Sequence, residues 1–103
     1  EEDGLAMSSR NKRLTEEQRR NAVFISEILR KTAADFSNKT IGELNQFAKN
    51  AFAENEYLEL EYFEIANVKT LKTANEKKEE VTYRAFVAAY AGEVRLIDNI
   101  ALN

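Results

Sequence analysis

The first half of the chain repeats its apolar residues at steps of three and four, which is the period of a helix that buries one face. Between residues 15 and 36 the apolar positions are Ala22, Ile25, Leu29, Ala33 and Phe36, and the opposite face carries Arg20, Glu27 and Lys31. Thr15, with Gln18 three residues later, fits a capping box. We therefore predict a helix that begins after Thr15 and ends near Ala34.

A second helix is indicated after the polar break at residues 37–39. Thr40 and Glu43 form another capping box, in which each side chain accepts a hydrogen bond from the backbone of the other residue. The apolar residues that follow at helical spacing are Leu44, Phe47, Ala48, Ala51 and Phe52. Residues 15–55 are thus predicted to form a helical hairpin.

The period then changes from helical spacing to strict alternation, which is typical of a half-buried strand. Leu58, Leu60 and Tyr62 alternate with Glu59 and Glu61. The phase slips after Tyr62, so that Phe63 and Ile65 continue the apolar positions. This slip indicates a bulge, or a strand that starts late, and favours a strand over residues 61–66.

The last third of the chain predicts a connector and a hairpin. Residues 67–80 contain a turn and a charged run at 76–80 that is compatible with a short helical turn. Residues 81–90 and 94–102 are rich in strand-forming side chains and flank a three-residue link centred on Gly92. The predicted fold class is therefore α+β, a helical hairpin followed by a three-stranded antiparallel sheet over residues 57–102, within one domain of residues 1–103.

Composition excludes several kinds of chemistry. The chain has no Cys and no His, which rules out disulfides, Cys/His zinc sites, thiol nucleophiles and Ser-His triads within these residues. A net charge of −3 is opposite in sign to a general nucleic-acid-binding surface. No apolar run approaches the roughly 20 residues of a membrane span, and the acidic start is unlike a signal peptide, so we expect a cytoplasmic protein.

Two segments resemble one enzyme family. Residues 3–11 read Asp3, Gly4, Leu5, Ala6, Met7, Ser8, Ser9, Arg10 and Asn11, and residues 92–99 read Gly92, Glu93, Val94, Arg95, Leu96, Ile97, Asp98 and Asn99. Both segments, in this order and at this separation, resemble the signature of pantoate–beta-alanine ligases. Residues 13–19 and 62–65 also match the places where that family has its first helix and first strand, so the resemblance covers the whole chain.

The resemblance implies that this chain is the C-terminal lid domain of a ligase related to class I nucleotidyl transferases. In that family ATP activates pantoate as an adenylate, which beta-alanine then attacks to give pantothenate. The larger N-terminal nucleotide-binding domain, with its histidine motif, is expected to supply most contacts to pantoate, beta-alanine and magnesium, and to form a homodimer. Since this chain lacks histidine, we expect it to be inactive alone.

The resemblance also assigns an ATP-binding loop to residues 1–13. Met7, Ser8, Ser9 and Arg10 match the family's counterpart of the KMSKS loop, with Arg10 in the cationic role. The chemistry of these residues suits the assignment, because small hydroxyls beside a guanidinium fork can bind the oxygens of a departing pyrophosphate. Met7 is the least specific of the four, since it could equally pack the loop down. No metal-binding or catalytic residue is predicted.

Two other functions remain open from the residues alone. Arg10, Lys12, Arg13, Arg19 and Arg20 place five basic residues in eleven positions, as in a module that binds RNA or another anion. Five acidic residues among the first twenty oppose that interpretation. A small dimerisation domain is the weaker alternative. We expect Asp98 and Asn99 to be structural, Arg84 and Arg95 to lie on the solvated sheet face, and the four tyrosines to be half-buried.

Overall fold

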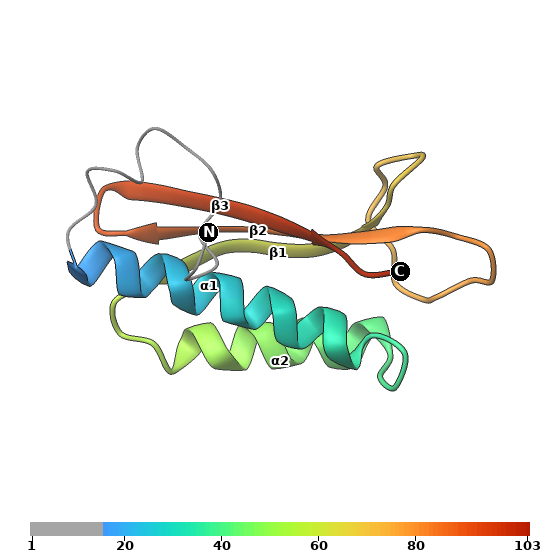
Figure 1. Ribbon diagram of the computed structural model, residues 1–103, viewed down its shortest axis with the longest axis horizontal. Coiled ribbons are helices and arrows are strands. Elements are labelled where there is room, and N and C mark those ends of the chain that lie inside the picture. Colours follow the sequence, from blue (N-terminus) through green and yellow to red (C-terminus); the bar gives the residue numbers. More distant parts are fainter. Residues whose placement is uncertain (1–15) are drawn as a thin grey trace.

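The computed structural model describes residues 16–103, which form two layers (Figure 1). The helical layer contains α1 (Glu16–Asp35) and α2 (Ile41–Ala53). The sheet contains β1 (Glu59–Asn67), β2 (Tyr83–Ala91) and β3 (Val94–Ala101). This architecture confirms the predicted fold class. Thr15 and the first predicted capping box lie outside the described residues.

The three strands are antiparallel in the order β1-β2-β3, with β2 in the centre. Both helices cover the same face of the sheet, α2 packing mainly on β1 and α1 on β2 and β3 (Figure 1). On β2 the residues that face the helices are Tyr83, Ala85, Val87 and Ala89, all buried. Their spacing of two is the strand period that the sequence displays.

The core is formed by the apolar stripe of each helix and the inner face of the sheet. Its most completely enclosed large side chains include Ile25, Leu29, Ile41, Leu44, Ile65 and Val87. Helical residues 25, 29, 44, 48 and 52 are buried as their periodicity predicts. Phe24 of α1 and Phe52 of α2 meet edge to face, with ring centroids 5.3 Å apart. The two helices are thereby joined directly as well as through the sheet.

The second capping box is confirmed at the start of α2. The Glu43 amide donates to Thr40 Oγ1 at 3.1 Å, and the Thr40 amide donates to Glu43 Oε1 at 2.9 Å. These two bonds satisfy amides that have no partner within the helix. They also hold the pKa of the Glu43 carboxyl below its ordinary value of 4.5, because both the backbone and the side chain of Thr40 interact with it.

The strand β1 contains the bulge that the phase slip indicates, but it is longer than predicted. Its register passes from the pair Leu60 and Ala89 to the pair Tyr62 and Ala88, which leaves Glu61 without a partner on β2. The strand begins at Glu59 and ends at Asn67, not at residues 61 and 66. The alternative of a strand that starts late is wrong, because pairing is established on both sides of the bulge.

Two other local predictions differ from the structure. Residues 76–80 contain a bend at Glu76 and a turn at residues 79–80, with no helical turn, because the Glu76 carbonyl and the Lys78 amide bond to the Tyr83 hydroxyl. The β2–β3 link has two residues, Gly92 and Glu93, since Ala91 already pairs with Val94. Gly92 has a φ of 62°, a left-handed conformation that glycine adopts without a steric cost.

Candidate functional site

The four residues assigned to ATP phosphates, Met7, Ser8, Ser9 and Arg10, lie outside the described residues. The structure does describe the point where the chain enters the domain. The helix α1 begins at Glu16, at the same end of the molecule as the β2–β3 hairpin (Figure 1). A loop that precedes α1 is therefore connected to the domain beside this hairpin.

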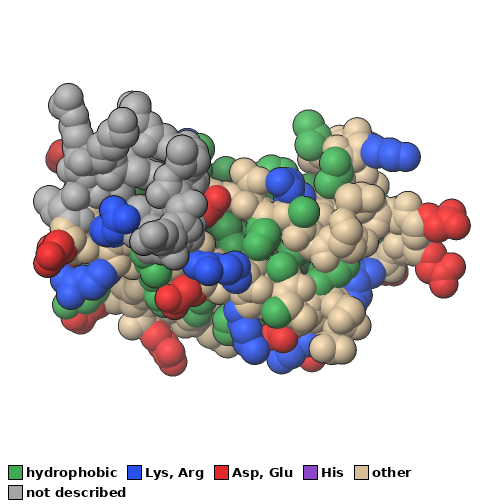
Figure 2. Space-filling view, viewed as in Figure 1, with side chains coloured by type: hydrophobic (Ala, Val, Ile, Leu, Met, Phe, Trp, Pro, Cys, Tyr) green, Lys and Arg blue, Asp and Glu red, His purple; other side chains and the backbone are tan. Residues whose placement is uncertain are grey.

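A shallow groove of about 510 Å³ borders this end of α1. Its lining residues are Glu16, Arg19, Arg20, Val23, Phe24 and Glu27. Arg19 and Arg20 are exposed, but two of the other lining groups are carboxylates. The groove thus has an apolar floor and a rim of mixed charge, which differs from a dedicated anion site. In Figure 2, acidic and basic side chains are likewise interspersed over the described part of the visible face.

The outer face of the sheet carries a charged pair near the hairpin. Arg95 Nε donates to Glu61 Oε1 at 2.7 Å, and Arg95 Nη2 donates to Glu61 Oε2 at 3.3 Å. The hydrogen bond and the attraction of Glu61 raise the pKa of Arg95 above its ordinary value. Arg84, on the same face, donates from Nε to Asn99 Oδ1 at 2.9 Å. The predicted solvated positions of both arginines are therefore confirmed.

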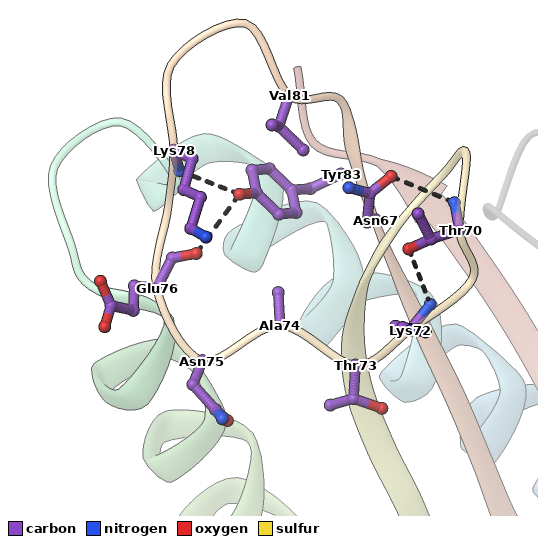
Figure 3. Close-up of a pocket in the computed structure, with 10 residues that line it drawn as sticks. All are labelled: Asn67, Thr70, Lys72, Thr73, Ala74, Asn75, Glu76, Lys78, Val81 and Tyr83. Atoms are coloured by element: carbon purple, nitrogen blue, oxygen red, sulfur yellow. Dashed lines mark hydrogen bonds between the residues drawn. The ribbon is translucent and has the colours of Figure 1, made fainter.

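A second cavity, of about 320 Å³, lies between β1, the start of β2 and the connector that joins them (Figure 3). Tyr83 points into it, accepts a hydrogen bond from the Lys78 amide at 2.9 Å and donates to the Glu76 carbonyl at 3.3 Å. Asn67 Oδ1 and Thr70 Oγ1 accept bonds from nearby connector amides. Because these polar atoms bind backbone groups of the connector, the residues that line the cavity hold the connector in place.

Lys77, next to this cavity, reaches back to the helical layer. Its Nζ donates to the Phe36 carbonyl at 2.6 Å and lies 5.0 Å from the centroid of the Phe36 ring. Phe36 also packs against Tyr83, with centroids 5.8 Å apart. A cation at this position stabilises the carbonyl end of α1 and contacts an aromatic face at the same time. The charged run of the connector is therefore partly structural.

Asp98 lies on the helix-facing side of β3, because it pairs with the buried Val87. Its Oδ1 accepts a hydrogen bond from the Asn99 amide at 2.8 Å. Burial raises the pKa of Asp98 above its ordinary value of 3.8, while that hydrogen bond and the attraction of Arg30 oppose the shift. The hydrogen bonds of Asp98 and Asn99 within residues 16–103 are local or cross-strand, and Asp98 is also attracted by Arg30 of α1, in agreement with the structural role expected for them.

The tyrosines do not share the half-buried state that the sequence predicts. Tyr83 is fully buried and Tyr62 is half-buried, whereas Tyr57 is 60% exposed and Tyr90 is 37% exposed. The ion pair between Glu61 and Arg95 was not predicted either. The phase slip at Tyr62 indicated the bulge that contains Glu61, but not the partner of its side chain. Strand alternation alone does not show that a bulge directs a carboxylate toward an arginine two strands away.

Across residues 16–103 no group of three or more acidic side chains is placed to hold a metal ion. Neither α1 nor α2 has the length and apolar character needed to cross a bilayer. These findings concern the described part of the chain only.

Comparison with known proteins identifies the relationship. The model of the family described as pantoate-beta-alanine ligase matches residues 1–101. The chain is 48% identical over 103 residues to a pantothenate synthetase of Christiangramia forsetii, and 41% identical over 100 residues to one of Bacteroides thetaiotaomicron. These alignments cover 100% and 97% of this chain but 36% of each relative.

A solved structure agrees with the sequence matches. The crystal structure of pantothenate synthetase from Thermus thermophilus superimposes with a TM-score of 0.83 at 29% identity, over 99% of this chain and 37% of that one. This chain thus spans little more than a third of the length of the relatives that it matches. Because the family model matches nearly every residue, the chain belongs to the pantoate–beta-alanine ligase family.

Proposed function

We propose that this chain is the C-terminal domain of an ATP-dependent, AMP-forming ligase that joins pantoate to beta-alanine. In the reaction, a pantoate carboxylate oxygen attacks the α-phosphorus of ATP and pyrophosphate leaves. The amine of beta-alanine then attacks the carbonyl carbon of the adenylate, loses a proton and displaces AMP. The observation that supports this proposal is the family match over residues 1–101, which includes the whole predicted phosphate loop.

Within this proposal, residues 1–13 form the ATP-phosphate loop of a single domain of residues 1–103. Ser8 and Ser9 supply hydroxyl and amide donors, Arg10 supplies a two-pronged cation and Met7 packs the loop. Such groups act by positioning phosphates and neutralising charge as pyrophosphate departs. Magnesium arrives with ATP and needs no ligand set in this domain.

The rest of the enzyme is proposed to supply what this chain lacks. A nucleotide-binding N-terminal domain would contribute histidines, hold pantoate and beta-alanine, and form the homodimer. A loop at the edge of a separate domain binds phosphates productively only when the other domain presents them. We therefore propose that the 103-residue chain has no ligase activity alone, and that the complete enzyme acts in the cytoplasm.

The RNA-binding alternative has no specific support in the described residues. Arg19 and Arg20 lie beside Glu16 and Glu27, whose charges oppose the approach of a phosphate backbone. Arg10, Lys12 and Arg13 lie outside the described part. A salt-dependent shift of labelled RNA on titration with this chain would favour that alternative over the ligase proposal.

The decisive experiment measures catalysis by the longer protein that contains this domain. With ATP, pantoate and beta-alanine, it should release one AMP and one pyrophosphate for each pantothenate formed. Arg10→Ala should lower adenylate formation by roughly a hundredfold or more, because such a donor contributes about 3 kcal/mol to the transition state. Lys12→Ala is the matched control for a loss of positive charge. Unchanged turnover in Arg10→Ala would remove Arg10 from the mechanism, and absence of any pantothenate would overturn the proposed reaction.

A further inference from the structure

The side of α1 that faces away from the sheet carries a row of charged residues around an apolar centre. Glu16, Arg20, Val23, Glu27 and Lys31 follow one another at steps of four, three, four and four, so they lie on one face of the helix. The four charged residues are exposed and Val23 is half-buried, whereas the opposite face of α1 contributes to the core. We call these five residues the charged stripe.

Two shallow grooves meet at the apolar centre of the charged stripe and share Phe24. The first, of about 510 Å³, follows the stripe itself. The second, of about 420 Å³, lies between α1 and the end of α2, where Ala51 and the 60% exposed Tyr57 line it. An apolar centre within a charged rim is the arrangement that protein interfaces have.

The two charges nearest to this centre have no ionic partner in the described part of the chain. Neither Arg20 nor Glu27 forms an ion pair with another residue of 16–103. They lie seven residues apart, about 10 Å along the helix axis, which prevents them from pairing with each other. Lys31 pairs with Asp35 at 3.2 Å, but its side chain is still 58% exposed. The charges of the stripe are therefore available to a second molecule.

The order of charges along the stripe is complementary to the same stripe read backwards. When two copies of α1 pack antiparallel about a two-fold axis between positions 23 and 24, positions whose numbers add up to 47 face each other. Arg20 of each copy then lies opposite Glu27 of the other copy, and Glu16 lies opposite Lys31. Both pairings unite opposite charges, and the symmetry makes each of them twice. The apolar side chains meet at the axis.

From this pattern we propose that the charged stripe is a contact surface for a second copy of the same domain, with the two α1 helices antiparallel. The inference goes beyond the proposed function and does not depend on it. A purely acidic or purely basic partner would place like charges against half of the stripe, whereas a second copy satisfies charges of both signs.

The size of the contact predicts a weak and reversible association. Positions 16–31 span about 22 Å of helix at about 1.5 Å per residue, and a helix is about 10 Å wide, which gives a face of roughly 220 Å². Stable complexes typically bury about 800 Å² on each partner. We therefore expect dimers at high protein concentration, in which the opposite charges fix the register of the two helices.

The first measurement is cysteine cross-linking in the 103-residue chain, which has no cysteine of its own. A residue beside a two-fold axis faces the same residue of the other copy, so a short bis-maleimide should join two chains of Val23→Cys. Lys49→Cys is the control, because Lys49 is exposed on α2 and lines neither groove. Each cross-linking rate is divided by the labelling rate of the same thiol with a simple maleimide. We expect the normalised rate at position 23 to be about tenfold higher or more.

The second measurement reverses charges in the Val23→Cys chain. Arg20→Glu and Glu27→Arg each place like charges opposite one another, so each should lower cross-linking about tenfold. The variant with both changes restores opposite charges and should cross-link like the parent. Glu27→Arg makes the net charge of −3 less negative, so a general loss of repulsion predicts faster cross-linking for this variant, not slower. Lys49→Glu, a charge reversal outside both grooves, should have no effect.

Equal normalised rates at positions 23 and 49 would overturn the proposal. Cross-linking at position 23 that withstands both single charge reversals would also overturn it, because the antiparallel pairing requires those contacts. Circular dichroism of each variant verifies that the domain is folded, and the substituted charges are exposed, so folding is retained. The outcome is independent of ligase activity, which the assay with the longer protein measures.

Discussion

The Arg95 guanidinium binds the Glu61 carboxylate across the width of β2, with both nitrogen to oxygen contacts between 2.7 and 3.3 Å. Glu61 is the extra residue of the β1 bulge, and Arg95 lies opposite Tyr90 on the far edge strand. A bulge frees one residue from the ladder and redirects its side chain. The irregularity in β1 thus coincides with a contact that joins the two outer strands.

We expect this pair to contribute little to stability, because both side chains are between a third and a half exposed. In urea unfolding of Glu61→Ala, Arg95→Ala and the double variant, the losses should be less than additive at low salt. The coupling should shrink at 1 M NaCl, since salt screens exposed charges. A coupling that is the same at both salt concentrations would show that the pair is effectively buried.

The helices were predictable because their signals are local. Apolar spacing identified the buried faces of α1 and α2, and Thr40 with Glu43 marked the start of α2. A capping box needs only residues three apart, so neighbouring sequence contains the whole interaction. The bulge in β1 was predictable for the same reason, since a change in alternation is visible within a few residues.

Two features were not predictable from the sequence, namely a contact of the connector with a distant residue and the burial of individual side chains on α1. Lys77 binds the Phe36 carbonyl, 41 residues away in sequence. Thr32 is buried in α1 because its hydroxyl donates to the Ile28 carbonyl at 2.8 Å, a bond that periodicity does not reveal. Ile28 is also buried, although the predicted stripe does not include it. Burial at such positions follows from the width of the surface that each helix covers.

For the functional site, the sequence offers a family resemblance, and the structure shows the end of the domain at which the predicted ATP-binding loop joins α1. Ser8, Ser9 and Arg10 remain predictions, since they lie outside the described residues. The clustering of Tyr62, Phe86 and Ile97 on the sheet face away from the helices could not be recognised from alternation, because they look like ordinary strand residues until the register aligns them. Only the arrangement of strands shows that they form one surface.

Loss of the α2 cap should be measurable in the 103-residue chain. Thr40→Ala removes the acceptor of the Glu43 amide and should lower the free energy of unfolding by about 1 kcal/mol. Thr40→Ser retains a hydroxyl and is the matched control, with a smaller loss. Urea unfolding followed by circular dichroism gives both values. Equal stability of the alanine variant and the wild type would mean that solvent replaces the cap.

Tyr83→Phe should destabilise the connector. The change removes a buried hydroxyl and leaves the Lys78 amide and the Glu76 carbonyl without this partner, which should cost about 1 kcal/mol. Hydrogen exchange of the Lys78 amide should accelerate more than that of the β2 amides. Tyr90→Phe is the control, since Tyr90 lies on the exposed face. If both variants behave alike, the hydroxyl of Tyr83 does not hold the connector.

Glu43 should make stability fall in acid. Its folded-state pKa lies below the ordinary value of 4.5, so its charged form stabilises the fold above that pH, and this contribution is lost as the pH falls through the folded-state value. Glu43→Gln can still accept the bond from Thr40 but carries no charge. The difference in unfolding free energy between wild type and variant should therefore shrink below pH 4.5. A constant difference in unfolding free energy down to pH 2 would show that the charge of Glu43 does not stabilise the cap.

Asp98 should have the opposite pH dependence. Burial raises its pKa in the folded state above 3.8, so the folded protein binds this proton more readily than the unfolded chain does. The stability associated with the protonated form is present below pH 3.8 and is lost as the pH rises through the folded-state pKa. Asp98→Asn keeps an oxygen for the Asn99 amide and removes the charge. The variant should therefore stabilise the domain at pH 7. The gain should be only about a few tenths of a kcal/mol, because solvent screens this half-buried group. That gain should vanish at low pH in urea unfolding. If Asp98→Asn is instead destabilising at pH 7, the attraction of Arg30 outweighs the cost of burying the carboxylate.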